Sequence, residues 1–136
     1  CACTMNSILK QFIKHLTVGE NEVVLLDMEA GVEHFGRGVD NSVDLILMIV
    51  DPSFESLKLT KKIQQLGDSI GKTVFFVLNK VNELVLPTML ESIDDQSKVL
   101  AVISTDTEIA RKGLVGDELM MEIPEIHMLA RKILKQ

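Results

Sequence analysis

The chain has 136 residues, 46% of them hydrophobic, and contains neither Trp nor Tyr. Its 14 basic and 20 acidic residues give a net charge of -6, which disfavours binding along a phosphate backbone and excludes nucleic acid as an expected partner. The length and hydrophobic content predict a single domain, residues 1–136, with a core of its own.

The longest continuous apolar run, residues 45–50, is far shorter than the ~18 residues that a membrane-spanning helix needs. We find no basic-then-apolar leader, and two cysteines are too few for a disulfide framework. We therefore expect a cytoplasmic chain with no membrane partner. Because residue 1 is Cys and not Met, we interpret the chain as a cut or processed piece.

The first part of the chain predicts a helix and then a strand. Apolar residues recur at helical spacing from Thr4 to Leu16, and Gly19 ends the pattern. The run Glu22–Asp27 is rich in Val and Leu, which is typical of a buried parallel strand. The glycine-containing segment that follows, residues 31–38, indicates a loop.

Three further apolar runs predict strands, at residues 44–50, 73–78 and 99–103. The first is followed by a helical pattern that Ser53 caps and Gly71 ends, and Pro87 and Pro124 each begin another helix. Strands alternating with helices predict the α/β class, with a parallel, doubly wound sheet flanked by helices.

Four polar side chains follow the predicted strands: Asp27, Asp51, Asn79 and Asp106. In a parallel sheet the ligand lies beyond the carboxyl ends of the strands, so we expect these residues at one binding edge. A carboxylate there can hold the magnesium ion of a nucleotide, and an amide can pair with a purine edge. Strand-end Asp and Asn residues also commonly do nothing but cap turns.

Cys1 and Cys3 lie directly before the predicted N-terminal helix. The helix dipole favours the thiolate form, which binds metal ions. A tetrahedral zinc site needs four ligands and one pair supplies two, so two chains would complete a site of four thiolates. The alternative is that the two cysteines are simply small apolar residues beside a helix.

The segment Asp27-Met28-Glu29-Ala30-Gly31-Val32-Glu33-His34-Phe35-Gly36-Arg37-Gly38, with Cys1-x-Cys3 before it and Asn79-Lys80-Val81 after it, carries a resemblance. The chain resembles the C-terminal part of the CooC-type maturation ATPases of carbon monoxide dehydrogenase, in the deviant-P-loop group that includes MinD and ParA. The resemblance extends from Cys1 to the last helix.

This resemblance implies ATP or ADP with Mg²⁺ as cofactor, and a homodimer that inserts nickel into carbon monoxide dehydrogenase, its partner. Asp27 matches the magnesium-side catalytic acid, and Cys1 and Cys3 match a pair that binds Ni²⁺ or Zn²⁺ and joins the dimer. The nucleotide-binding positions are Gly31, Asn79, Lys80, Thr105 and Asp106. The switch positions, which couple nucleotide state to dimer shape, are Glu29, Glu33 and His34.

Two features depart from this family. The strand before Asp106 ends in Ile-Pro-x-Asp in relatives, whereas here it ends in Ile103-Ser104-Thr105-Asp106. The sequence also lacks the glycine-rich loop with Lys and Ser/Thr on which phosphoryl transfer depends. We therefore expect a P-loop NTPase fold without its P-loop strand, unable to hydrolyse ATP unless the missing N-terminal half is added.

The resemblance also implies that the P-loop strand lies between the strands that end at Asp27 and Asp51, so its removal opens the sheet there. We expect the missing half, a second copy, or direct closure of these two strands to repair the gap. Two other functions remain open. One is a switch of the MinD or ParA type without a metal role, which leaves the cysteines unexplained, and the other is a non-enzymatic α/β interaction domain.

Overall fold

The computed structural model describes residues 11–13, 15–20, 22–28 and 43–135. In chain order the elements are β1 (Ile46–Val50), α2 (Phe54–Ser69), β2 (Val74–Val81), α3 (Leu86–Glu91), the short 3-10 helix η2 (Gln96–Lys98), β3 (Val99–Ser104), α4 (Thr107–Val115) and α5 (Pro124–Ile133).

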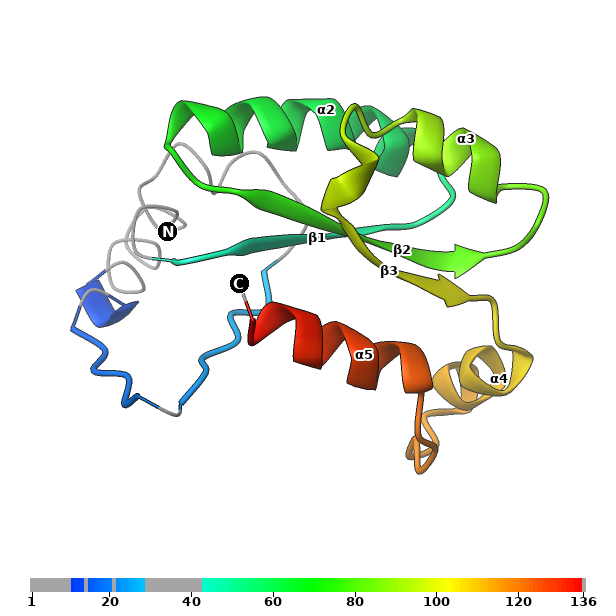
Figure 1. Cartoon of the computed structure of the whole chain (residues 1–136). Helices are drawn as coiled ribbons and strands as arrows, with labels where there is room; N and C mark the ends of the chain where they lie inside the picture. The colour runs from blue at the N-terminus through cyan, green and yellow to red at the C-terminus, as the bar shows by residue number, and fades with distance from the viewer. Residues whose placement is uncertain (1–10, 14, 21, 29–42, 136) are drawn as a thin grey trace, which may run out of the picture.

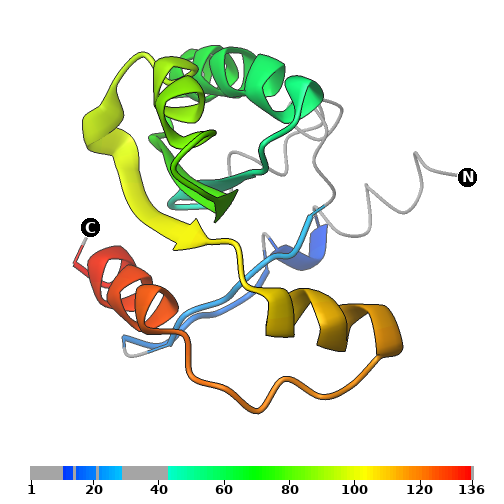
Figure 2. The ribbon, with the colours of Figure 1, turned by 90° about the vertical axis from the view of Figure 1, so that its right-hand side faces the viewer.

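The three strands form one parallel sheet in the order β1-β2-β3. Figures 1 and 2 show α2 and α3 on one face of this sheet and α5 on the other. The predicted α/β class, a parallel sheet flanked by helices, is confirmed. The predicted strands at 44–50, 73–78 and 99–103 correspond to β1, β2 and β3.

The core lies on both faces of the central strand, β2. Its side chains alternate: Phe76 and Leu78 join the cluster under α2 and α3, and Val77 joins the cluster under α5. Leu129 of α5 completes the second cluster. Since β2 is covered on both sides, it forms the continuous apolar run expected of a buried parallel strand.

The ends of α2 follow from local sequence. The Ser53 side chain caps the helix by accepting a hydrogen bond from the Ser56 backbone N–H (3.2 Å). After the helix, Gly71 adopts φ +67°, a left-handed conformation in which glycine carries no steric penalty. Pro87 lies in the first turn of α3, and Pro124 is the first residue of α5, both as predicted.

The predicted strand at Glu22–Asp27 is wrong. Residues 22–28 adopt no regular secondary structure, and Leu25 is 85% exposed. The run has the composition of a buried strand, but a strand also needs a neighbour for its backbone groups. Within the described residues β1 pairs with β2 alone, so direct closure between this segment and β1 does not occur.

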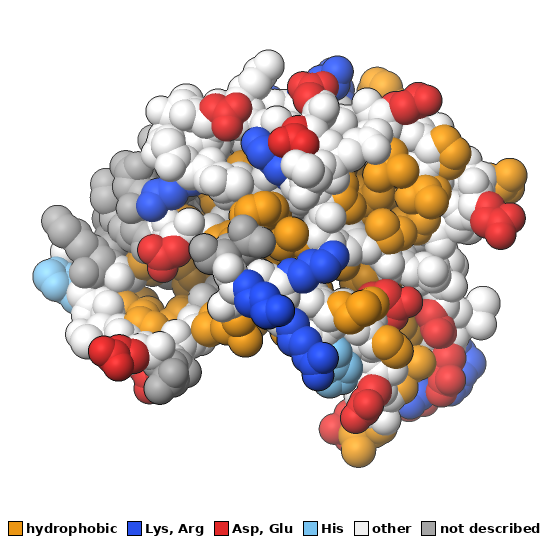
Figure 3. All heavy atoms as spheres, in the orientation of Figure 1, with side chains coloured by type: hydrophobic (Ala, Val, Ile, Leu, Met, Phe, Trp, Pro, Cys, Tyr) orange, Lys and Arg blue, Asp and Glu red, His pale blue; other side chains and the backbone are white. Residues whose placement is uncertain are grey.

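The predicted N-terminal helix is only partly covered by the described residues. Residues 11–13 are helical, with Ile13 buried, and residues 1–10 lie outside the described part of the chain. In the part of the chain that is described, no helix is long and apolar enough to cross a bilayer. Basic side chains gather over α5 on the face shown in Figure 3.

Candidate nucleotide-base site

The carboxyl ends of the three strands meet at one edge of the sheet, as predicted. Asp51 follows β1, Asn79 and Lys80 lie near the end of β2, and Thr105 and Asp106 follow β3. The Thr105 backbone N–H donates to the Val81 carbonyl at 2.9 Å, which ties the end of β3 to the end of β2. Residues far apart in sequence therefore form one polar edge.

Asp51 is held from two sides. Asn79 Nδ2 donates to Asp51 Oδ1 at 2.9 Å, and Lys80 Nζ forms an ion pair with Asp51 Oδ2. The Lys80 and Asp51 side chains are 62% and 38% exposed, so the ion pair is screened by solvent and adds little stability. Its clearer effect is geometric, because it fixes the position of the carboxylate.

The turn after β1 supports the same arrangement. The Asp51 backbone N–H donates to Ser56 Oγ at 3.1 Å, and the Ser56 backbone N–H donates to Ser53 Oγ. The first turn of α2 thus anchors the backbone of Asp51 while Asn79 and Lys80 hold its side chain. Both ends of the residue are fixed by neighbouring elements.

Lys80 has an unusual backbone conformation, with φ +55°. A non-glycine residue rarely adopts positive φ, and such strain is concentrated at functional sites. Here it accompanies an irregular stretch in the pairing of β2 with β3, where the register shifts between Leu78 and Val81. The irregularity lies directly at Asn79 and Lys80.

Asp106 caps helix α4. Its Oδ1 accepts hydrogen bonds from the backbone N–H groups of Glu108 (2.7 Å) and Ile109 (3.0 Å). The resemblance predicts nucleotide binding for Asp106, with turn capping as the alternative. The observed hydrogen bonds give the capping role a physical basis and leave Oδ2 for any other contact.

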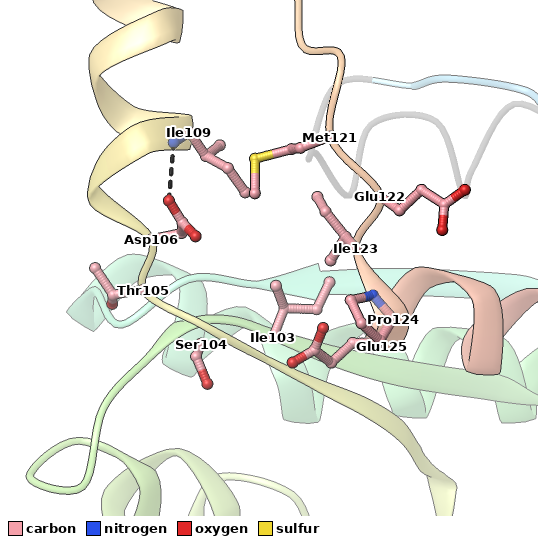
Figure 4. Close-up of a pocket in the computed structure, with 10 residues that line it drawn as sticks. All are labelled: Ile103, Ser104, Thr105, Asp106, Ile109, Met121, Glu122, Ile123, Pro124 and Glu125. Carbon is pink, nitrogen blue, oxygen red and sulfur yellow. Dashed lines mark hydrogen bonds between the residues drawn. The ribbon is translucent and has the colours of Figure 1, made fainter.

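A pocket opens beside Asp106, with a cavity volume of about 220 Å³. It lies between the end of β3, the start of α4 and the segment that leads into α5 (Figure 4). Its lining combines apolar and polar side chains: Ile103, Ser104, Thr105, Asp106, Ile109, Met121, Glu122, Ile123, Pro124 and Glu125.

The chemistry of this lining disfavours a phosphate group. Ile103, Ile109 and Ile123 supply apolar surface, and Ser104 and Thr105 supply hydroxyl groups. Among the described residues that line the pocket none is cationic, so nothing in this lining would neutralise a phosphate. Figure 4 shows the Glu122 carboxylate directed away from the other labelled side chains.

The remaining predicted site residues fall into two groups. Asp27 is described and is exposed in the irregular segment 22–28, not at the end of a strand. The other positions lie outside the described residues, so the structure does not describe their arrangement: the cysteine pair Cys1 and Cys3, Gly31, and the switch positions Glu29, Glu33 and His34. Their roles remain predictions.

Helix α4 and the pocket wall that follows it were not predicted from the sequence. The available signals were local: Asp106 as a helix cap, Glu108 in the first turn, and Gly116 as the left-handed residue at the end, with φ +72°. Met121, in the segment after α4, contributes to the pocket wall.

Comparison with known proteins adds independent information. No protein-family profile matches the chain. An uncharacterized ATP-binding protein of Methanocaldococcus jannaschii is 46% identical over 126 residues, covering 93% of this chain and 50% of that protein. A second uncharacterized ATP-binding protein of the same organism is 31% identical over 125 residues, covering 90% of this chain and 49% of its own length.

A third relative carries a functional name. The carbon monoxide dehydrogenase accessory protein CooC of Rhodospirillum rubrum is 34% identical over 117 residues, covering 85% of this chain and 44% of that protein. The chain spans about half the length of the curated relatives it matches. Over most of its own length the chain is therefore similar to ATP-binding proteins and to a carbon monoxide dehydrogenase accessory protein. In each of these relatives the similar region is about half of the protein.

Proposed function

We propose that this chain is the base-binding half of a nickel-insertion accessory ATPase for carbon monoxide dehydrogenase, which binds ATP or ADP with Mg²⁺. The observation that carries the proposal is the pocket at the end of β3, the strand that pairs with β2, in a chain similar to ATP-binding proteins. The similarity to CooC supports the choice of partner.

The pocket supports the assignment to the base rather than to the phosphates. An adenine ring needs apolar surface for its faces and a few hydrogen-bonding groups for its edge, and the lining offers both. Asn79 lies on the neighbouring strand and provides an amide of the kind that reads a purine edge. Lys80 is fixed by Asp51 at the same edge.

We assign the phosphate side of the site to residues nearer the N-terminus. In this proposal Asp27 supports the magnesium ion, Gly31 lies near the terminal phosphate, and Glu29, Glu33 and His34 transmit the nucleotide state. Because the sequence contains no glycine-rich loop with Lys and Ser/Thr, the chain alone binds nucleotide weakly and does not hydrolyse ATP. Adding the N-terminal P-loop half is required for turnover.

The metal part of the proposal rests on Cys1 and Cys3. Two thiolates from each of two chains supply the four ligands that zinc prefers, and thiolates bind nickel as well. The metal would thus be held between the protomers of a nucleotide-dependent homodimer. The argument depends on the C-x-C spacing and on the similarity to CooC.

Nucleotide binding is the first test. Titration of the chain with ADP, followed by NMR, should shift the resonances of Asn79, Thr105 and the pocket residues. Asn79→Ala should weaken binding about tenfold, the loss expected for one well-made hydrogen bond, whereas the exposed control Gln65→Ala should leave it unchanged. Shifts confined to other surfaces would refute the base site.

Turnover and metal content test the rest. The chain alone should release no phosphate from ATP, and an added P-loop half should restore hydrolysis. Purified protein should contain about one Ni²⁺ or Zn²⁺ per two chains. If changing Cys1 and Cys3 to Ser left metal content and dimerisation unaltered, the proposed metal site would be wrong.

A further inference from the structure

Asn79 lies between two different neighbours at the edge of the sheet. On one side is β1, where the Asp51 carboxylate accepts a hydrogen bond from Asn79 Nδ2 at 2.9 Å. On the other side is β3, where Ile103 lies across from the irregular stretch of β2 and lines the pocket. Asn79 is therefore placed between an acid on one side and, on the other, a strand whose end lines the pocket.

The pleat of β2, whose pairing with β1 is regular up to Leu78, places Asn79 on the same side of the sheet as Ile103. Val77, two residues earlier, belongs to the cluster under α5, and Ile103 packs against the same cluster. Side chains two residues apart in a strand lie on the same face. Asn79 thus shares a face with Ile103 and is half-buried there.

The chemistry of the partner fixes which end of the amide faces Asp51. An ionised carboxylate only accepts hydrogen bonds, so the NH₂ group of Asn79 must be the end that meets it. The carbonyl oxygen is then directed elsewhere. Among the described residues no donor reaches this oxygen, so it is available to a ligand.

Asp51 is itself prevented from turning. Lys80 Nζ pairs with its second carboxylate oxygen, and Ser56 Oγ accepts a hydrogen bond from its backbone N–H. With Oδ2 paired to Lys80 and the backbone anchored by Ser56, Oδ1 of Asp51 meets Asn79 from a fixed position and favours one orientation of the amide. The fixed position of the Asp51 carboxylate therefore fixes the orientation of the Asn79 amide.

We infer that Asp51 is a positioning residue for base selection: by holding the NH₂ group of Asn79, it makes the site present a carbonyl oxygen to the ligand. An acceptor pairs with the amino group of a 6-aminopurine such as adenine, and it meets the carbonyl of a 6-oxopurine with repulsion. The inference rests on the proposed function and specifies how that site selects its base.

The test compares adenosine with inosine, which carry an amino and a carbonyl group at position 6 and contain no phosphate. NMR titration of the unaltered chain should show adenosine binding about tenfold more tightly than inosine. In Asp51→Asn the amide of Asn79 is free to turn and offer its NH₂ group. The preference should fall below about threefold.

The matched control is Asp94→Asn, which makes the same chemical change at an exposed acid paired with Lys61 on the surface. It should retain the full preference. If Asp51→Asn also retained it while the unaltered chain preferred adenosine, the inference would be wrong and the proposed function would stand. If the unaltered chain bound neither nucleoside, both the inference about Asp51 and the proposed function would be wrong.

A second measurement needs no variant. Asn82 is oriented the opposite way, because its Oδ1 accepts from the backbone N–H groups of Leu84 and Val85. The side-chain NH₂ protons of Asn79 should therefore exchange with solvent more slowly than those of Asn82. Equal exchange rates would contradict the fixed orientation of Asn79. This result does not depend on whether the Asp51 variant folds.

Discussion

The two faces of the sheet are packed to different degrees. Under α2 and α3, the larger cluster of buried side chains includes Val50 of β1, which is fully buried. Under α5 the cluster is smaller, and the neighbouring residue Ile49 on that face of β1 is 50% exposed. Within the described residues, helices cover one side of β1 and leave the other open.

Chain connectivity explains the difference. Both α2 and α3 connect successive parallel strands, and right-handed crossovers between strands in this order place both helices on one face. The opposite face depends on α5, which packs on β3 at the far side of the sheet from β1. The face under α2 and α3, called the closed face below, therefore provides most of the core. The face under α5, called the open face, carries Asn79 and the pocket.

The largest loss of stability is expected where α3 packs on the closed face. Met89 of α3 is fully buried in the larger cluster, so Met89→Ala should lower the free energy of unfolding by about 2–5 kcal/mol. Urea denaturation measures the change. The exposed control Leu84→Ala should stay within about 0.5 kcal/mol. Equal losses for the two variants would mean that Met89 does not pack α3 against this face.

A smaller loss is expected where α2 and α3 are joined by a buried hydroxyl. Thr60 is fully buried, and its Oγ1 lies 2.7 Å from the Ser92 carbonyl and 2.8 Å from the Leu57 carbonyl. Thr60→Val keeps the shape but leaves the Ser92 carbonyl unpaired, which should cost about 1–3 kcal/mol in the same assay. The exposed hydroxyl of Ser69 provides the control, since Ser69→Ala should have little effect.

The sequence predicted the closed face well. Continuous apolar runs marked β1, β2 and β3, and Ser53, Gly71 and Pro87 marked the helix ends between them. These features depend on residues close in sequence or on burial, which composition reports directly. The run at 22–27 has the same composition but forms no strand, because composition does not reveal whether a pairing partner is present.

The site was predicted only in part. The meeting of Asp51 with Asn79 follows from parallel strands that end at one edge, and the sequence indicated it. The positive φ of Lys80 could not be predicted, since no glycine marks it. Helix α4 was not predicted, although Asp106 and Gly116 mark its ends, because it is short and buries no side chain. The pocket that it helps to form was therefore not predicted either.

On the open face, the contact of α5 with β3 can be weakened directly. Lys132 Nζ donates a hydrogen bond to the Leu100 carbonyl, at the irregularity in β3 pairing. Because the lysine is exposed, Lys132→Met should cost only about 0.5–1.5 kcal/mol. Lys135→Met, one turn further on, is the control. Hydrogen exchange should show faster opening of α5 in the first variant alone, with β1 and β2 unchanged.

The smallest effect is expected at Asp95, which lies in the connection between α3 and β3 and belongs to neither face. The Ser97 hydroxyl and then the Ser97 backbone N–H donate to this carboxylate and hold its pKa below the usual value, against weak desolvation and with help from Lys98. A lowered folded-state pKa means that the stabilisation is present above the unfolded-state pKa. It is lost as the pH falls through the folded-state pKa.

Ser97→Ala removes the larger of these contributions, so the pKa of Asp95 should rise toward its ordinary value. Titration of the Asp95 carboxyl carbon by NMR measures this directly, and the acid-side slope of stability should flatten slightly in the variant. Neither cluster of buried side chains contacts this turn through Ser97, so the packing of both faces should stay as it is. An unchanged titration midpoint would show that the Ser97 hydroxyl does not hold the carboxylate in solution.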